Sequence, residues 1–586
     1  MEKWIEIRKS GNFAEWGREL GIDPLCARVI RNRGAETIDE ARDYLEGDLS
    51  LLHDPFLLPD MDRCVAGLLE AIDNGEKIRV VGDYDVDGVT STYILVRGIS
   101  ACGGDVSYAI PHRLKDGYGI NDDIVKDAAS DGTGLIITCD NGIAAASQVA
   151  LAYELGMKVI VTDHHQVPFT EENGLKKEIL PQCIAVVDPH RKGSEYPYKG
   201  ICGAMVAFKV IMALQSKRPS DKLQSVLDEA VQFAALGTAC DVMDLCDENR
   251  IVVKEGLRRM QNTSNKGLKA LMNANSLTGT KLSAYSLSFV IGPCINSTGR
   301  LESASESVGL LLSDDYDECL KEALDIRQLN DLRKNMTTTG VKKALEIMES
   351  ENMEARKVLV IYLPDAHESI AGLVAGKIKE RFNRPTLVVT KGEEGLKGSG
   401  RSIPAYNMFE KLSEVKDLFT KFGGHAMAAG FSLEEANLSA LSEQLNENCA
   451  LTDDDLLKEV RFDACVPLDY ISTGLIRDLE KLEPVGSANP GALFAWKDVE
   501  IKSASRMGKE GQYGRLNAYC NGRSFKLINF GDMNAFDSYI NAKYGEGTAE
   551  NLYACTGSIK LDICYEPGIN EFKGNEYVDF KLKYYM

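Results

Sequence analysis

The stretch Ile78-Arg79-Val80-Val81-Gly82-Asp83-Tyr84-Asp85-Val86-Asp87-Gly88 indicates the fold of the first half of the chain. It is a short apolar run that ends in three acids at alternate positions. Three later runs, 135–139, 159–162 and 184–187, also end in an acid, and Ala/Gly-rich segments with helical spacing, such as 144–155, lie between the runs. Runs that are apolar at nearly every position are typical of strands buried on both faces, so the alternation predicts a parallel α/β sheet.

Acids and histidines follow these predicted strands. They form three groups, Asp83 to Asp87, Asp140-Asn141-Gly142 and Asp163-His164-His165. In a parallel sheet the ligand site lies beyond the carboxyl ends of the strands, where all three groups are expected. An aspartate after a strand often only caps the next helix, but carboxylates and imidazoles from three strand ends suit Mn²⁺ or Mg²⁺. We therefore expect a site for two ions about 3.5 to 4 Å apart.

Length and composition limit the protein class. The chain has 586 residues, 44% of them hydrophobic and 26% charged, which is typical of a globular protein with at least three domains. Its net charge of −21 argues against a surface that binds nucleic acid all over, so a polyanion would be bound locally. The 15 cysteines include no Cys-x-x-Cys pair, and no apolar run reaches membrane-spanning length. We expect a cytoplasmic protein with no membrane partner.

The rest of the chain has three further parts. Residues 314–356 contain no proline and predict one long exposed helix or a helical pair, and 358–389 begin a second α/β segment. From 460 onward, short alternating strands predict a small β domain. Within it, 496–530 carries seven Lys/Arg against three acids, with Tyr513, Tyr519 and Phe525 interleaved. This pattern favours an OB-fold that binds single strands, although aromatic residues that only fill the barrel interior are the alternative.

Further motifs extend the pattern. They are 233–242 (FAALGTACDV), 295–301 (INSTGRL), 398–402 (GSGRS) and 422–431 (FGGHAMAAGF). With the three acidic groups, they resemble the DHH phosphoesterase superfamily, and the whole chain is similar to its exonucleases that act on single-stranded DNA. The resemblance implies an α/β fold made of a parallel-sheet DHH domain, a long connecting helix, a DHHA1-like α/β domain and a C-terminal OB-fold β-barrel. It implies domain limits of 1–60 (a helical lead-in), 61–313, 314–356, 357–450 and 451–586.

The resemblance also assigns roles. The implied metal ligands, for two Mn²⁺ or Mg²⁺ ions, are Asp85, Asp87, Asp140, His164 and Asp241. Asp83 is either a ligand or a neighbour that orients one, and His165 is a catalytic candidate that contacts a phosphate oxygen or protonates the leaving 3′ oxygen. The implied substrate-binding residues are Arg113, Tyr118, Arg300, Ser399, Arg401, Ser402, Gly423, Gly424 and His425.

The function implied is metal-dependent exonuclease activity on single-stranded DNA in repair and recombination. It would proceed from 5′ to 3′ and release 5′-mononucleotides, with a single-strand-binding protein and a helicase as further partners. Two alternatives stay open. One is a DHH phosphoesterase for short oligonucleotides or cyclic dinucleotides, which would not need the basic C-terminal domain. The other is a non-catalytic scaffold that binds single strands, against which the complete set of acids and histidines speaks, because clustered unpaired carboxylates are costly.

Overall fold

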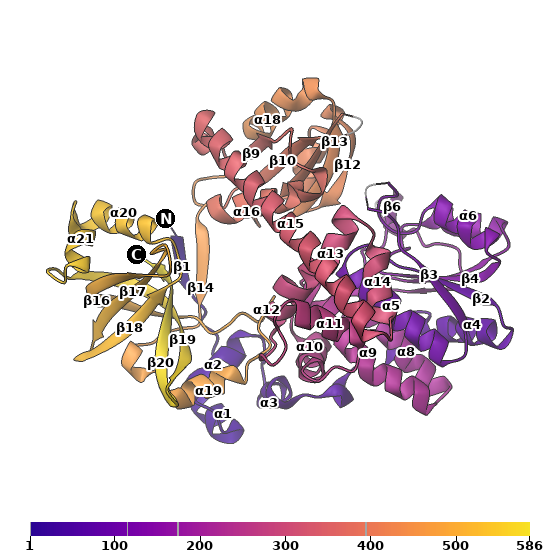
Figure 1. Cartoon of the computed structure of the whole chain (residues 1–586), viewed down its shortest axis with the longest axis horizontal. Coiled ribbons are helices and arrows are strands. Elements are labelled where there is room, and N and C mark those ends of the chain that lie inside the picture. Colours follow the sequence, from indigo (N-terminus) through magenta and orange to yellow (C-terminus); the bar gives the residue numbers. More distant parts are fainter. Residues whose placement is uncertain (1, 114, 173–174, 393–394) are drawn as a thin grey trace. The chain divides into compact units, whose positions relative to one another are not determined.

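The computed structural model describes residues 2–113, 115–172, 175–392 and 395–586, and divides into two compact units (Figure 1). The first unit comprises residues 53–243 and 255–458, and the second comprises 2–52, 244–254 and 459–586. Helix α10 (Asp247–Met260) contributes residues to both. Within the described ranges, we find no helix long and apolar enough to cross a membrane.

The first unit begins with the predicted parallel sheet. Its strand order is β3-β2-β4-β5-β8, with all neighbours parallel. The bounds are β2 (Lys77–Val81), β3 (Asp105–Ala109), β4 (Thr133–Cys139), β5 (Lys158–Thr162) and β8 (Ala185–Val187). Val81 pairs with Thr138, Thr138 with Val161, and Val161 with Val186. The residues that follow these strands therefore meet at one edge of the sheet, as the sequence predicts.

Helices cover both faces of this sheet. On one face, α6 (Asp122–Ser130) and α7 (Ala146–Glu154) share a core with Ile136, Val159 and Val161. On the other face lie α4 (Met61–Asp73), α5 (Val86–Ala101) and α8 (Gly203–Lys217), and α9 (Asp221–Cys240) packs on α5 and α8. Almost every side chain of α5 is buried, because this helix lies between the sheet and α8 and α9.

One long helix connects the two sheets of the first unit (Figure 1). This helix, α15 (Tyr316–Ser350), is 35 residues long and begins at Asp315, whose side chain caps it by accepting from the N–H groups of Asp317 and Glu318. It packs on α11 (Lys266–Ala274) and α13 (Gly292–Leu301), and also on α16 (Ala371–Phe382) and β9 (Leu359–Tyr362). The prediction of one long helix is confirmed. The remaining helices here are α12 (Ala284–Ser286), the π-helix η3 (Leu287–Ile291) and α14 (Ala304–Leu312).

The second sheet of this unit is mixed. Its order is β12-β13-β11-β10-β9, and only β9 and β10 are parallel. The bounds are β10 (Thr386–Lys391), β11 (Leu396–Arg401), β12 (Phe419–His425) and β13 (Ala428–Leu433), with helices α17 (Met408–Ser413) and α18 (Leu438–Glu447). A separate hairpin consists of β6 (Phe169–Glu172) and β7 (Leu175–Glu178). Short 3₁₀ helices are η1 (Leu49–Leu51), η2 (Pro55–Leu57), η4 (Met353–Ala355), η5 (Glu368–Ile370), η6 (Lys416–Leu418), η7 (Glu435–Asn437) and η8 (Leu468–Tyr470).

The second unit contains the predicted OB barrel. Its strands are β16 (Phe494–Met507), β17 (Tyr513–Cys520), β18 (Arg523–Asn529), β19 (Ile559–Phe572) and β20 (Asn575–Tyr585), and helices α20 (Met533–Tyr544) and α21 (Thr548–Tyr553) separate β18 from β19. Strand β16 pairs with both β17 and β19, and β18 and β20 pair in parallel, which closes the five strands. The two-residue strand β15 (Ala464–Cys465) extends this sheet. Of the interleaved aromatics, Tyr513 and Tyr519 are exposed, whereas Phe525 packs against Phe580 of the barrel.

The N-terminal residues pack with this barrel. They form α1 (Phe13–Leu20), α2 (Pro24–Asn32) and α3 (Ile38–Glu46), but also strand β1 (Glu2–Glu6), which pairs with β14 (Lys458–Phe462). The expectation of a helical lead-in did not include this strand, because its partner lies more than 450 residues further along the chain. A buried ion pair joins Arg33 to Asp463, with nitrogen to oxygen distances of 2.7 and 2.9 Å. Helix α19 (Thr473–Glu480) completes the unit.

Candidate metal centre and nucleic-acid pocket

The loop between β2 and α5 positions the first three acids. Asp85 caps α5, because its Oδ1 accepts from the N–H groups of Asp87 at 3.0 Å and Gly88 at 3.1 Å. The buried carboxylate of Asp87 accepts from the N–H groups of Gly203 at 2.6 Å and Ala204 at 2.8 Å, at the beginning of α8. Both carboxylates thus lie at helix N-termini, where the backbone stabilises negative charge.

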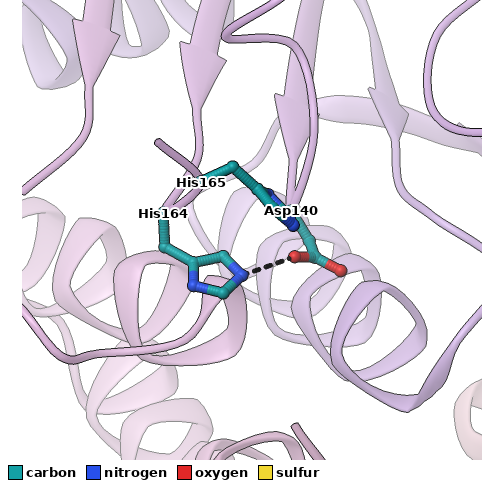
Figure 2. Close-up of side chains that lie close together, drawn as sticks. All are labelled: Asp140, His164 and His165. Atoms are coloured by element: carbon teal, nitrogen blue, oxygen red, sulfur yellow. Dashed lines mark hydrogen bonds and ion pairs between the residues drawn. The ribbon is translucent and has the colours of Figure 1, made fainter. Parts of the chain in front are cut away.

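Asp140 and His164 come together at the ends of β4 and β5 (Figure 2). The His164 Nε2 lies 3.0 Å from Asp140 Oδ1, 3.6 Å from Asp87 Oδ2 and 3.8 Å from Asp241 Oδ2. Asp241 is the C-cap of α9, which brings it to this edge from outside the sheet. Two three-residue groups result, Asp140/His164/His165 and Asp87/His164/Asp241, and within each group the ligand atoms lie within 4.8 Å of one another.

Asp163 holds His165 in place. Its Oδ1 lies 2.7 Å from His165 Nδ1 and accepts from the N–H groups of His164 and His165, and its Oδ2 accepts from the Ile143 N–H. The Tyr118 hydroxyl donates to the Asp140 carbonyl at 2.5 Å and lies 3.1 Å from His165 Nδ1. Tyr118 therefore lies beside the cluster, in contact with His165 and the backbone of Asp140, and its predicted role in substrate binding stays a prediction.

The electrostatics of this cluster favour a bound cation. Burial, and then repulsion from Asp87 and Asp85, raises the pKa of Asp241 to about 8. Burial and neighbouring carboxylates also raise the pKa values of Asp83, Asp85 and Asp140. Carboxylates with such pKa values lack compensating positive charge, which divalent ions would supply. Burial lowers the pKa of His164 and so favours the neutral imidazole that binds metals.

The histidine beside Asp163 has the opposite shift. Burial lowers the pKa of His165, but the hydrogen bond and charge of Asp163 outweigh this and raise the pKa to about 9. The pKa of Asp163 is lowered: burial raises it, but the contacts with His165 prevail. Of the predicted acids, Asp83 and Asp85 belong to neither three-residue group, and Asp83 Oδ1 accepts from the Gly119 N–H at 3.1 Å. Because Asp83 lies beside Asp85, we interpret it as a residue that orients the loop between β2 and α5.

A cationic pocket of about 450 Å³ lies between the two sheets of the first unit. Its charged lining consists of Arg113, Arg300, Lys397, Arg401 and Lys421, with Glu368 as the acid, and Tyr84, Ser369, Gly372, Ser399 and Gly423 are among its other lining residues. The Arg113 guanidinium lies over the Tyr84 ring at 4.7 Å. Burial, and then the charges of Arg113, Arg333 and Arg401, lower the pKa of Arg300 to about 9. The pocket thus has excess positive charge, which suits a phosphate.

Four of the predicted substrate-binding residues do not line this pocket, namely Tyr118, which lies beside His165, and Ser402, Gly424 and His425. Ser402 follows β11 and is buried, and its hydroxyl donates to the Tyr406 carbonyl at 2.5 Å. Gly424 and His425 lie at the end of β12, where they pair with Ala429 and Ala428. Gly423 lines the pocket and its neighbour Gly424 does not, because adjacent residues of a strand face opposite sides. Substrate binding by Ser402, Gly424 and His425 stays a prediction.

Two lysines of the pocket were missed by the sequence reasoning. Lys397 lies on β11 two and four residues before Ser399 and Arg401, so period-two alternation could have identified it. Lys397 forms an ion pair with Glu368 at 2.7 Å. Lys421 lies on the edge strand β12 two residues before Gly423, so the same alternation applies to it.

An acidic and imidazole cluster at the rim of a parallel sheet, with a cationic pocket beside a second α/β sheet, defines a phosphoesterase of the DHH class. Residues 77–238 match the N-terminal domain of the DHH family, 355–451 the DHHA1 domain, and 462–584 the RecJ OB domain. The chain belongs to the RecJ family.

Curated relatives and solved structures support this placement. The chain is 35% identical to the single-stranded-DNA-specific exonuclease RecJ of Salmonella typhimurium and 31% identical to that of Escherichia coli, over 97% and 98% of those proteins and 98% of this chain. It is 36% identical to the Bacillus subtilis RecJ over 84% of its own length, and this match spans 61% of that longer protein. The crystal structure of RecJ with Mn²⁺ from Thermus thermophilus superposes with a TM-score of 0.81 at 28% identity, covering 100% of this chain and 79% of that one. A structure of the Thermus protein with Mg²⁺ matches as well.

Proposed function

We propose that this protein is a metal-dependent exonuclease that degrades single-stranded DNA from the 5′ end and releases 5′-mononucleotides. The observation that carries the proposal is the cationic pocket within the same unit as the acidic and imidazole cluster. The names of the relatives support the substrate and the reaction.

The cluster fits two divalent ions of the Mn²⁺ or Mg²⁺ type. Oxygen and imidazole donors suit these ions, and the raised pKa values of Asp140 and Asp241 show the excess negative charge that they would offset. Asp85, Asp87, Asp140, His164 and Asp241 are the proposed ligands. When bound, such ions supply a nucleophilic water at neutral pH and neutralise charge on the scissile phosphate.

His165 is the proposed donor to the substrate. Asp163 accepts from its backbone N–H and lies 2.7 Å from its Nδ1, so the direction of the ring is fixed before a strand binds. The ring can then donate to a non-bridging phosphate oxygen or to the leaving 3′ oxygen. Tyr118 contacts both His165 and the backbone of Asp140, and therefore links the position of this donor to the metal edge.

The pocket is the proposed binding site of the 5′ phosphate, and this gives the polarity. Arg401 Nη1 donates to Ser399 Oγ at 3.1 Å, and Arg300 Nη1 donates to the Ser369 carbonyl at 2.7 Å, so both guanidinium groups are held in defined positions. Gly372 provides space for this arrangement, because a Cβ there would lie 2.7 Å from Arg401 Nη2. A strand whose end is captured here presents its first phosphodiester bonds to the cluster.

The barrel of the second unit is the proposed binding site for more distant nucleotides. Lys502 lies over the exposed Tyr519 ring at 3.8 Å, which combines a cation with a stacking surface.

We further propose that the protein acts in DNA repair and recombination, in the cytoplasm, with a single-strand-binding protein and a helicase as partners. The proposed domain limits are 1–60, 61–313, 314–356, 357–450 and 451–586.

A digestion assay tests the proposal. Oligonucleotides of the same sequence, single- or double-stranded and labelled at either end, are incubated with Mn²⁺ or EDTA, and product length is measured over time. We expect a 5′ label to be released at once as a mononucleotide from single strands with Mn²⁺ only. A 3′ label released first would refute the polarity. Preference for dinucleotides or cyclic dinucleotides would favour a small-substrate phosphoesterase, and uncut single strands would favour a scaffold.

A further inference from the structure

Two aromatic rings project from the helix that also carries Arg300. Segments α12, η3 and α13 follow one another without a break from Ala284 to Leu301, and the π-helical turn in the middle carries Phe289. The side chains of Tyr285 and Phe289 are 66% and 63% exposed, and their rings stack at 4.9 Å with an angle of 22°. Two large exposed rings that stack on each other are unusual in a surface that only faces water.

The π-helical turn is fastened to the residues that precede Asp241. Ser288 Oγ donates to the Ala239 carbonyl at 2.7 Å, and the Cys240 thiol donates to the Leu287 carbonyl at 3.5 Å. A Cβ on Gly292 would lie 2.4 Å from Cys240 Sγ, so glycine is required for this close approach. Val242, directly after Asp241, is 69% exposed. Turns of this kind are frequent at functional sites, and this one fixes the ring pair relative to a proposed metal ligand.

The same helix connects the sites that a bound strand would contact. Its C-terminal end carries Arg300, which lines the cationic pocket, and Gly299, which packs against the Tyr84 carbonyl of the acidic loop. The first half of the helix contacts Ala239 and Cys240 through Leu287, Ser288 and Gly292, and this half also carries the two rings. Phe289 and Arg300 are separated by roughly 16 Å of helix. A strand with its 5′ phosphate at Arg300 that runs along this helix toward Asp241 would therefore come to the half that carries Phe289.

We propose that Phe289 and Tyr285 form a stacking platform for nucleobases on the 3′ side of the scissile bond. The inference rests on the proposed function and deepens it, since it assigns the bases, and not only the phosphates, a role in holding the strand. We infer that the ligand is the bound single strand, because the rings lie on the helix that also lines the cationic pocket and contacts the metal edge. Unpaired bases expose π-faces that stack on aromatic side chains irrespective of sequence. The platform also explains a preference for single strands, because bases within a duplex are already stacked on their neighbours.

The first test combines ring removal with base removal. Phe289→Ala and Tyr285→Ala are compared with the wild type on 5′-phosphorylated single strands in which one abasic residue is moved stepwise from the 5′ end. We expect each variant to raise the KM on normal strands by about 5-fold to 100-fold, with a smaller change in kcat. With an abasic residue at the position that corresponds to the platform, the KM of the wild type should rise by the same factor. The KM of the variants should rise little further, because their stacking is already absent.

Matched variants separate stacking from folding. Phe289→Trp should restore the KM because it retains a stacking ring, and Phe289→Leu should not, although it retains apolar bulk. Tyr153→Ala removes an exposed ring from α7 and should leave the KM unchanged. An equal effect of abasic residues on the wild type and on Phe289→Ala at every position would overturn the platform.

A binding measurement distinguishes this inference from the proposed activity. In EDTA, strands carrying 2-aminopurine at successive positions should show quenched fluorescence at the platform position with the wild type, and less quenching with Phe289→Ala. If the wild type cuts no strand but this quenching is seen, the proposed function fails and the platform stands. If the wild type cuts and no position depends on Phe289, only the platform fails.

Discussion

Asp140 has a left-handed backbone conformation, with a φ of 60°, and its buried carboxylate contacts His164. Asparagine tolerates this conformation whereas alanine is strained there, so Asp140→Asn is the cleaner variant. We predict that it lowers kcat at least 100-fold with Mn²⁺, because each lost 1.36 kcal/mol of transition-state stabilisation is about tenfold in rate and a metal site supplies several.

The stability of this variant provides the control. Repulsion among Asp87, Asp85 and Asp140 opposes folding when no cation is bound, so the Tm of Asp140→Asn in EDTA should equal or exceed that of the wild type. A Tm several degrees lower would mean that the loss of activity reflects misfolding. Turnover close to that of the wild type would remove Asp140 from the metal site.

Arg401 is expected to select the chemical state of the 5′ end. Its guanidinium is largely buried in the cationic pocket and is held by Ser399 and the Gly400 carbonyl. We predict that Arg401→Ala reduces the ratio of kcat/KM for 5′-phosphorylated over 5′-hydroxyl strands by about tenfold or more, because a charge-assisted bidentate contact is lost. The exposed Arg381 on α16 supplies the control, and Arg381→Ala should keep the wild-type ratio. An unchanged ratio in Arg401→Ala would place the 5′ phosphate elsewhere.

Glu306 is predicted to make stability depend on pH. Partial burial, and then the neighbouring Glu302 and Glu322, raise the pKa of Glu306 from 4.5 to about 7. The unfolded carboxyl loses its proton first as the pH rises, so the free energy of unfolding falls between about pH 4.5 and pH 7 and is level above. Glu306→Gln should therefore raise stability at pH 8 by up to ~1 kcal/mol after allowance for solvent screening, and by nothing below pH 4.5.

Thermal unfolding at pH 4.5 and pH 8 measures this difference. The exposed Glu349 of α15 offers a matched variant, and Glu349→Gln should give the same small change in Tm at both values. A Tm gain for Glu306→Gln that is equal at both values would show that the three carboxylates do not repel one another in the folded protein.

The positions of some site residues could be predicted from the sequence, and those of others could not. Asp85 and Asp140 follow apolar strands, so their meeting at one edge follows from the parallel topology alone. Asp241 needed the family resemblance, because it reaches the cluster from the end of a helix. Lys421 was missed although it lies two residues before Gly423 on β12, because its place in the pocket also depends on how the two sheets of the first unit face each other.

At the scale of elements, the close packing of α9 against α5 and α8 positions Asp241. Gly237 makes it possible, because a Cβ there would lie 2.6 Å from both Asp87 Oδ1 and Ala204 Cβ. We predict that Gly237→Ala destabilises the protein by about 1 to 3 kcal/mol and lowers activity, since α9 must move and carries Asp241 with it. Gly376, in α16, has open space around its Cβ position, and Gly376→Ala should instead stabilise by about 0.5 to 1 kcal/mol.

Chemical denaturation of both variants checks this contrast, with activity under saturating Mn²⁺ as the second measurement. Full stability in Gly237→Ala would show that the packing of α9 at this point accommodates a methyl group.

The elements of the fold were partly predictable from the sequence. The apolar runs gave β2, β4, β5 and β8 within a few residues, whereas strand β1 was missed because five polar and apolar residues acquire strand character only by pairing with β14.

At the scale of the whole molecule, sequence proximity and structural proximity diverge. The first 52 residues fold with the C-terminal barrel, and Arg33 forms a buried pair with Asp463. The sequence predicts only a helical lead-in at 1–60, because nothing local encodes a contact across more than 400 residues. The two units also have separate hydrophobic cores, one around Phe494 and Tyr565 and others around the two sheets of the first unit. Such cores permit separate unfolding.

We therefore predict that calorimetry resolves at least two unfolding transitions and that Mn²⁺ shifts only those of the first unit, which contains all the proposed ligands. At a free metal concentration 100 times the Kd, binding stabilises the folded state by about 2.7 kcal/mol, which raises the Tm of that unit by several degrees. His164→Ala should abolish the shift and leave the transition of the barrel unit in place, whereas Tyr577→Ala, at an exposed position of β20, should retain it. Equal Mn²⁺ shifts in every transition would contradict the separation, because the two units would then unfold as one and the metal would stabilise the chain as a whole.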